Sequence, residues 1–218
     1  MKLVVFDVDG TLVDSQAQIV GAMRRAMDQA GLPELTRAHI LSIVGLSLPE
    51  AVARLLPDTP ATLRDVVVAG YRTAFMERRI ESEAPLFPGM GGLIDRLAAR
   101  EDLLLGVATG KSRRGLDAML DHHGLRRHFV TLQTADGHPS KPHPEMLLSA
   151  CAAAGIAPER AVMIGDTEYD IQMAAAAGCA AIGVEWGYHP ADALRRLGAP
   201  VAADTAALDT MIGEWADD

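Results

Sequence analysis

The amino-acid sequence predicts an α/β fold, in which a Rossmann-like parallel sheet is covered by helices on both faces and carries an inserted all-helical cap. Short apolar runs alternate with segments of helical periodicity, which is typical of a parallel sheet with crossover helices. One interval, from Ser15 to about Ala84, contains no convincing strand and only amphipathic helical segments. This break in the alternation indicates an inserted helical unit.

The elements follow in order along the chain. The predicted strands are Leu3–Phe6, Leu103–Ala108, Phe129–Leu132, Ala161–Ile164, Ala180–Val184 and Pro200–Ala202. The predicted helices of the core cover residues 90–100, 113–122, 144–154, 169–177, 190–197 and 205–215. Each link between strands is long enough for a right-handed crossover. The predicted helices of the insertion are Ile19–Ala30, Leu48–Leu56 and Leu63–Arg79.

These elements divide the chain into two predicted domains. We expect residues 1–14 and 86–218 to form the catalytic core and residues 15–85 to form the cap. The insertion begins directly after an acidic turn and is closed by a second connection that contains proline. Both connections therefore emerge beside that turn, which favours a lid over it.

Composition excludes several classes of function. The chain has 218 residues, of which 49% are hydrophobic, so a sizeable core is expected and disorder is not. The formal net charge of −9 argues against a general surface for nucleic acid or anionic membranes. We expect neither a secretory leader nor a membrane span, and therefore a cytoplasmic protein. Cys151 and Cys179 lie in segments rich in alanine and glycine and are expected to be core thiols.

The first strand delivers two carboxylates into a turn. Asp7 and Asp9 follow the apolar run, and Gly10 allows the backbone to turn away after them. Alternate residues of an extended segment point the same way, so both side chains can address one crevice. Two such groups repel each other unless a cation lies between them. Magnesium suits the site, because it binds one or two carboxylates and takes its other contacts from water and a phosphate.

Further polar groups follow later strands of the predicted sheet. Thr109 and Gly110 end the second strand and supply a hydroxyl and a backbone N–H, which can bind phosphoryl oxygens. Lys141 stands before a predicted helix and is one of only three lysines in the chain. Asp166 follows a strand, and Asp170 lies one helical turn later. Because open α/β sheets bind ligands at the carboxyl ends of their strands, we expect these groups to share one site.

At these residues the sequence resembles the haloacid dehalogenase-like superfamily over nearly the whole chain. The four motifs are Asp7-Val8-Asp9-Gly10-Thr11, Thr109, Lys141, and Gly165-Asp166 with Asp170. The helical insertion after the first motif is similar to the phosphatase branch with a C1-type cap. The segment Gly183-Val184-Glu185-Trp186-Gly187-Tyr188 is similar to phosphoglycolate phosphatases in particular.

The resemblance implies a magnesium-dependent phosphomonoester hydrolase that acts on a small phosphorylated metabolite. Asp7 would attack phosphorus and form an aspartyl-phosphate, while the side chain of Asp9 would serve as general acid and then general base. Mg²⁺ would be held by Asp7, the backbone carbonyl of Asp9 and Asp166. Thr109 and the Gly110 N–H would bind the phosphoryl group. The ammonium of Lys141 would offset the negative charge shared by Asp7 and the phosphoryl group. Asp170 would orient Asp166, Lys141 or a metal-bound water.

Two other functions remain open from the sequence. A sugar phosphomutase of the same family uses the same acid and base, although its usual first motif carries valine where Thr11 stands here. A phospho-accepting receiver module is an alternative of a different class, but its accepting aspartate lies on a later strand and it has no large helical insertion. The leaving alcohol is not identified, and phosphoglycolate is the first candidate. Substrate selectivity is expected to come from residues of the insertion: Gly45-Leu46-Ser47, Arg24, Arg54 and Arg72.

Overall fold

The computed structural model describes residues 1–81 and 83–218, and it contains a fully parallel sheet of six strands in the order β3-β2-β1-β4-β5-β6. The strands are β1 (Lys2–Phe6), β2 (Leu103–Thr109), β3 (Phe129–Thr134), β4 (Ala161–Gly165), β5 (Ala180–Val184) and β6 (Val201–Ala202). All six predicted strands are present, with ends that differ by two residues at most. β1 lies inside the sheet between β2 and β4, at the point where the strand order reverses direction. Open α/β sheets usually bind ligands at this point.

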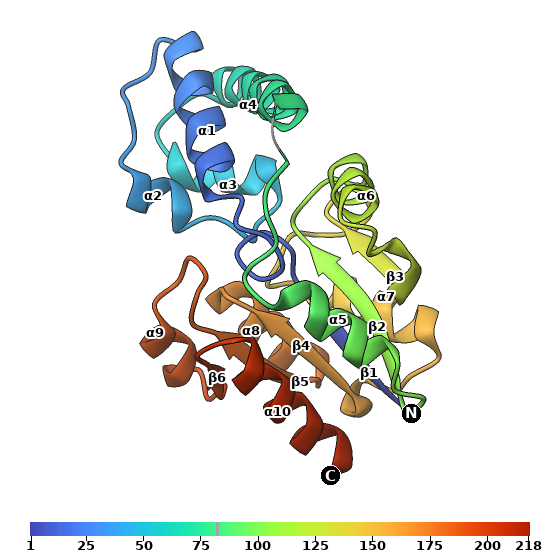
Figure 1. Cartoon of the computed structure of the whole chain (residues 1–218). Helices are drawn as coiled ribbons and strands as arrows, with labels where there is room; N and C mark the ends of the chain where they lie inside the picture. Colours follow the sequence, from blue (N-terminus) through green and yellow to red (C-terminus); the bar gives the residue numbers. More distant parts are fainter. Residues whose placement is uncertain (82) are drawn as a thin grey trace.

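Helices cover both faces of the sheet, as predicted (Figure 1). The helices on one face are α5 (Met90–Ala98), α6 (Arg113–His122) and α10 (Thr205–Asp217). The helices on the other face are α7 (Glu145–Ala154), α8 (Glu168–Ala177) and α9 (Ala191–Arg196). Two short 3₁₀ turns, η1 (Arg126–His128) and η2 (Pro158–Arg160), precede strands β3 and β4. No helix in the described part of the chain is both long and apolar enough to cross a bilayer.

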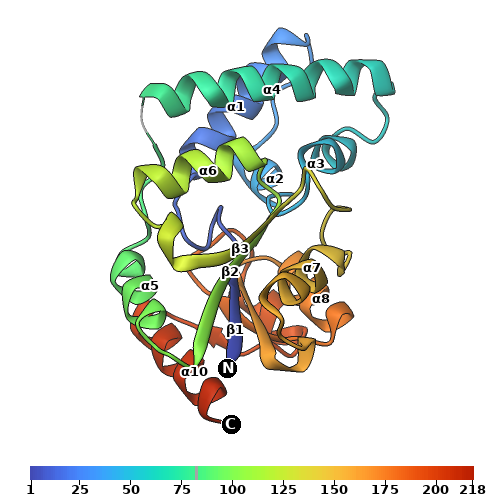
Figure 2. The same ribbon diagram turned by 90° about the vertical axis from the view of Figure 1, so that its right-hand side faces the viewer.

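The interval between β1 and α5 is helical, and we call residues 15–85 the helical insertion. Its helices are α1 (Gln16–Gln29), α2 (Arg37–Leu41), α3 (Leu48–Leu55) and α4 (Ala61–Glu81). They bury their own apolar cluster, in which α1 packs along α4. The short helix α2 was not predicted, because five residues are too few to display helical periodicity. The insertion lies at the opposite end of the molecule from both chain termini (Figures 1 and 2).

The two connections to the insertion run side by side. The Asp14 N–H donates to the Pro85 carbonyl at 2.9 Å, and the Phe87 N–H donates to the Leu12 carbonyl at 3.0 Å. Val13 and Leu86 form an antiparallel bridge between these contacts. The entry and exit of the helical insertion are therefore tied together beside the turn that follows β1.

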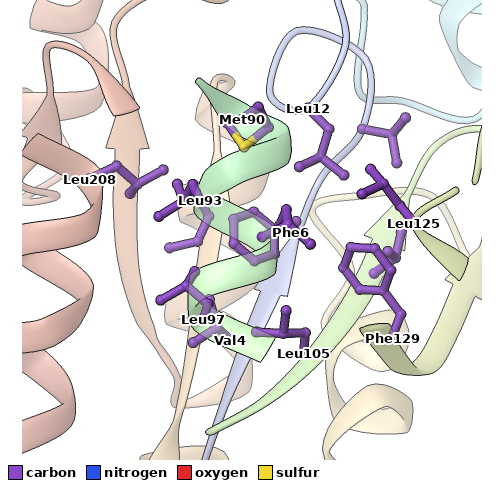
Figure 3. Packing of buried hydrophobic residues seen from close by; sticks show 14 of the residues in the cluster. Val4, Phe6, Leu12, Met90, Leu93, Leu97, Leu105, Leu125, Phe129 and Leu208 are labelled. Carbon is purple, nitrogen blue, oxygen red and sulfur yellow. The ribbon is translucent and has the colours of Figure 1, made fainter. Parts of the chain in front are cut away.

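An apolar core fixes the central strand from one face (Figure 3). Phe6 is completely buried and meets the ring of Phe129 edge to face at 6.5 Å between centroids. Val4 and Phe6 point to this face, while Leu3 and Val5 point to the opposite apolar cluster. Burial on both faces explains why β1 reads as an unbroken apolar run. Cys151 is buried and Cys179 is half-buried in that opposite cluster, and both are free thiols.

Candidate active site

The turn after β1 brings its acidic residues to the carboxyl edge of the sheet. The Val8 carbonyl accepts hydrogen bonds from the N–H groups of Leu12 and Val13 at 2.9 and 3.1 Å, which closes the turn. Gly10 has a φ of +91°, and a Cβ at this position would collide with the carboxylate of Asp166. Glycine is therefore required here both by the backbone conformation and by the close approach of a second acid.

Lys141 lies between two carboxylates inside the protein. Its ammonium is 2.9 Å from Oδ1 of Asp7 and donates to Oδ1 of Asp170 at 2.6 Å, and all three side chains are at most 1% exposed. Burial by itself would lower the pKa of Lys141, but the charges of Asp170 and Asp7 outweigh it and hold the pKa above its usual value. The charged form of Lys141 is therefore favoured beside Asp7.

Asp170 is positioned by the first turn of α8. Its Oδ2 accepts hydrogen bonds from the backbone N–H and the hydroxyl of Thr167, at 3.1 and 2.6 Å. The Thr167 hydroxyl in turn accepts from the Asp170 N–H, which completes a capping box at the helix start. Both oxygens of Asp170 are thus engaged, one by the helix cap and one by Lys141. The supporting role of Asp170 stays a prediction.

Asp166 is held by two segments that are distant in the chain. Its Oδ1 accepts from the Thr11 hydroxyl at 2.9 Å, and its Oδ2 accepts from the Tyr188 N–H at 2.8 Å. A Cβ at Gly187 would collide with the Asp166 side chain, so the loop after β5 covers this carboxylate closely. Trp186 fastens the same loop to the turn after β1, because its indole N–H donates to the Thr11 carbonyl at 3.1 Å.

The buried acids form a site that fits a divalent cation. Ligand atoms of Asp7, Asp166 and Asp170 all lie within 4.8 Å of one another. Burial raises the pKa of Asp7 to about 6, an effect that Lys141 opposes and Asp170 reinforces. Burial raises the pKa of Asp166 well above its ordinary value too, and the charges of Asp7 and Asp170 add to this.

The hydrogen bonds at the carboxylate oxygens indicate which acids can still bind a cation. Within residues 1–81 and 83–218, Oδ2 of Asp7 accepts no hydrogen bond although it is buried. Each Asp166 oxygen accepts a single hydrogen bond and keeps a further lone pair. Oδ2 of Asp170 accepts two hydrogen bonds, and its Oδ1 lies 2.6 Å from the positive ammonium of Lys141, which disfavours a second cation there. An oxygen-binding cation such as Mg²⁺ would satisfy Asp7 and Asp166 and offset their repulsion.

The end of β2 supplies a hydroxyl and a backbone amide. Thr109 is 1% exposed, and its hydroxyl oxygen accepts from the Lys111 N–H at 3.2 Å, so its proton stays available to another acceptor. Gly110 contacts the helical insertion directly, because a Cβ there would lie 2.6 Å from the carbonyl oxygens of both Gly45 and Leu46. This glycine is required by the close approach of two backbones.

Lys111 was not predicted as a site residue. Its ammonium donates to both oxygens of Asp9, at 2.8 and 3.0 Å, and its side chain is only 8% exposed. The ring of Phe75, from helix α4, lies 4.9 Å from the ammonium on the side of the insertion. Lys111 directly follows Thr109-Gly110 and is one of only three lysines in the chain. These two sequence features could have identified it as a site residue.

A cavity of about 680 Å³ lies between the core and the helical insertion. Its core side includes Asp7, Asp9, Thr109, Gly110 and Lys111. Its insertion side is mainly apolar and includes Ile19, Met23, Val44, Leu46, Tyr71 and Phe75. The volume is in the ordinary range for small-molecule sites.

The residues expected to select the substrate lie in different places. Arg72 and the segment 45–47 line the cavity. Arg24 forms an ion pair with Glu34 and Arg54 with Glu50, and neither arginine lines the cavity.

The helical insertion is docked on the core around this cavity. The Ser47 N–H donates to the Ser140 hydroxyl at 2.8 Å, next to Lys141. The Ser42 carbonyl accepts from the Tyr169 hydroxyl at 3.1 Å and lies 3.1 Å from Nε2 of His189. The insertion therefore covers the carboxyl edge of the sheet in this structure (Figure 1).

The seven site residues predicted from the sequence converge at one edge of the sheet. Their arrangement has two parts, a buried network centred on Lys141 and a cavity-facing group that includes Asp9. Thr11, Lys111, Gly187 and Tyr188 complete this arrangement and were missed as site residues. The carbonyl of Asp9 as a metal ligand stays a prediction.

Comparisons with known proteins find relatives that match most of the chain. The family model described as haloacid dehalogenase-like hydrolase matches residues 4–184. A probable phosphatase, IndB, from Dickeya dadantii is 38% identical over 93% of this chain and 89% of its own length. A phosphoglycolate phosphatase from Chromobacterium violaceum is 36% identical over 89% of both chains. The crystal structure of a predicted phosphatase from Clostridium acetobutylicum superposes with a TM-score of 0.88, at 25% identity and 98% coverage of both chains.

Proposed function

Because the chain belongs to the haloacid dehalogenase-like hydrolase family, as a relative of phosphatases, we propose that it is a magnesium-dependent phosphomonoester hydrolase with an aspartyl-phosphate intermediate. Phosphoglycolate is the first candidate substrate, since one of the relatives carries that name. The observation that carries the proposal is the buried Asp7, whose Oδ2 accepts no hydrogen bond from the described residues while Lys141 lies 2.9 Å from Oδ1. Such a carboxylate is poised for a cation and a phosphoryl group rather than for a structural contact.

The proposed chemistry assigns one role to each group. An oxygen of Asp7 forms a bond to phosphorus as the bond from phosphorus to the alcohol oxygen breaks. Asp9 gives a proton to the departing alcohol and later removes one from the water that hydrolyses the aspartyl-phosphate. The Thr109 hydroxyl and the Gly110 N–H bind phosphoryl oxygens, and Lys141 balances the negative charge.

The metal has a defined place in the proposal. Asp7, Asp166 and the backbone carbonyl of Asp9 would hold Mg²⁺. When bound, the ion supplies charge stabilisation to an anionic nucleophile and an anionic phosphate. Asp170 positions Lys141 through their 2.6 Å contact and is not assigned to the metal.

We also propose the domain division predicted from the sequence, with a core of residues 1–14 and 86–218 and a cap of residues 15–85. The docked contacts of Ser42 and Ser47 support a cap that excludes bulk water while it covers the acids. A cytoplasmic location and a small phosphorylated metabolite as partner are parts of the same proposal.

The alternatives can be weighed against the site. A sugar phosphomutase uses the same machinery but returns the phosphoryl group to its substrate. Thr11 favours hydrolysis, because the usual first motif of that class carries valine at this position. A receiver module fits poorly, since the acid facing Lys141 follows the first strand and relatives are enzymes.

The test is a screen for release of inorganic phosphate from a panel of phosphorylated metabolites. We expect release that requires Mg²⁺ and is abolished in Asp7→Asn, because the amide is not a nucleophile. Asp9→Asn should retain the metal site and lose turnover. Full magnesium-dependent release by Asp7→Asn would contradict the mechanism, and isomerised sugar phosphate without free phosphate would establish the mutase instead.

A further inference from the structure

Lys111 occupies a place that the proposed mechanism does not use. Its ammonium contacts both oxygens of Asp9, the residue proposed to meet the leaving alcohol. The next atoms of that alcohol must therefore pass close to Nζ of Lys111. The phosphoryl group itself is bound by a separate set of groups around Lys141 and Thr109, so Lys111 remains for the other end of the substrate.

Within the described residues, Asp9 is the acid that pairs with the shielded ammonium of Lys111. The side chain is 8% exposed, and among the described residues the two Asp9 oxygens are the hydrogen-bond acceptors of Nζ. The other neighbour is the ring of Phe75, on which Tyr71 stacks at 5.6 Å, and rings supply no acceptor of comparable strength. To reach the leaving oxygen, Asp9 must turn an oxygen away from this ammonium. A shielded ammonium that loses an acceptor is destabilised unless another oxygen replaces it.

We propose that Lys111 is a specificity-determining residue, which binds a carboxylate on the leaving alcohol close to the ester oxygen. This inference rests on the proposed hydrolase function and deepens it, because it assigns the residue that would select phosphate monoesters of short hydroxy acids such as phosphoglycolate. A substrate carboxylate can take the place of the Asp9 oxygen beside the Lys111 ammonium, because it has the same charge and geometry. A substrate hydroxyl can accept a hydrogen bond there but carries no charge. The apolar insertion wall then needs no basic residue for this discrimination.

The test compares two esters that differ in one group. 2-Phosphoglycolate carries a carboxylate where 2-hydroxyethyl phosphate carries a neutral hydroxymethyl group. We expect wild-type protein to prefer the carboxylate ester in kcat/KM, and Lys111→Met to lower that preference by roughly 10- to 100-fold, as for a lost hydrogen bond between charged groups. Lys111→Arg should keep part of the preference. Loss of the contact to Asp9 affects both esters, so it cancels in the ratio.

Matched variants separate specificity from general damage. Lys2→Met makes the same replacement at the amino end of β1, where Lys2 donates to the Trp215 carbonyl, and should leave the ratio unchanged. Arg72→Met removes a cation on the insertion side of the cavity, and it should change the ratio less than Lys111→Met does. Direct binding gives a second readout: 2-phosphoglycolate should bind Asp7→Asn more tightly than Asp7→Asn/Lys111→Met by calorimetry, with little difference for 2-hydroxyethyl phosphate.

The outcomes distinguish the two proposals. Equal use of both esters by wild-type protein, or a ratio unchanged in Lys111→Met, would overturn the role of Lys111 while the hydrolase stands. Loss of the preference in Arg72→Met but not in Lys111→Met would overturn it as well. Hydrolysis of an aryl phosphate but of neither two-carbon ester would overturn the substrate class and the role of Lys111 while the hydrolase stands. Absence of magnesium-dependent hydrolysis of any ester would overturn the hydrolase and the inference together.

Discussion

The two walls of the cavity are built on different principles. Asp7 lies on the core wall and is paired with Lys141 behind it, which also contacts Asp170, and all three residues are at most 1% exposed. On the insertion wall, apolar and aromatic side chains dominate, and Arg72 is exposed. Buried charges are tolerated only when they are paired, so the core wall permits few substitutions. The mainly apolar insertion wall has no such constraint.

The largest effect should come from breaking the buried network at Lys141. Lys141→Met leaves Asp7 and Asp170 facing each other without a cation. We expect kcat to fall by about 10²- to 10³-fold and unfolding free energy to fall by about 3–5 kcal/mol. Initial rates and urea denaturation measure the two effects. Lys2→Met is the control for the same replacement on a partly exposed lysine, and a Lys141 variant with activity within tenfold of wild type would contradict the network.

The raised pKa of Asp7 should make the stability of the protein depend on pH. Burial raises the pKa of Asp7 from 3.8 to about 6, so the folded protein binds a proton more tightly than the unfolded chain. The stability that this proton contributes is present at low pH and is lost as pH rises through about 6. Without divalent metal, Asp7→Asn should therefore become more stable than wild type as pH rises from 3.8 to about 6. The difference in unfolding free energy should reach about 3 kcal/mol at most.

Urea denaturation in chelator across this pH interval checks the expected gain. Mg²⁺ should reduce the difference, because the cation stabilises the charged form of Asp7 in wild-type protein. A difference between the two proteins that does not change with pH would show that Asp7 is not destabilised by burial.

The contact between the walls is tested at Gly110. In Gly110→Ala the new Cβ would lie 2.6 Å from the carbonyl oxygens of Gly45 and Leu46, and backbone atoms on both sides must shift. We expect a loss of about 1–3 kcal/mol in stability and a comparable loss in kcat/KM. Gly91→Ala is the matched control, because its Cβ would meet only a Leu86 methyl group at 3.4 Å. Unchanged kinetics in Gly110→Ala would argue against docking of the insertion during turnover.

The smallest effect is expected away from the cavity. Arg54 forms an exposed pair with Glu50 one helical turn away, and its guanidinium lies 5.3 Å from the ring of Tyr169. Arg54→Ala should cost less than about 1 kcal/mol and leave kcat/KM unchanged for every ester. A thermal melt and the ester panel measure this. A change in ester preference would mean that selectivity extends beyond the cavity-lining residues.

Local pattern was sufficient for most of the fold. β1 is buried on both faces and reads as an apolar run, and the glycine after Asp9 marks the turn that ends it. Helix α2 and the two 3₁₀ turns were missed, because segments of three to five residues carry no periodicity. The ends of α4 and α10 extend by two residues beyond their predicted limits, which is within the usual fraying of helix ends.

The sequence by itself determined which residues reach the carboxyl edge of the sheet, because strand ends and turns depend on near neighbours in the chain. Only the tertiary structure decided how these residues pair. Lys141 contacts Asp7 and Asp170, and Lys111 contacts Asp9 across 102 positions. Such pairings depend on how two strands and the covering helices pack, and on which opposite charges are close enough to pair when both are buried. No local pattern encodes that choice.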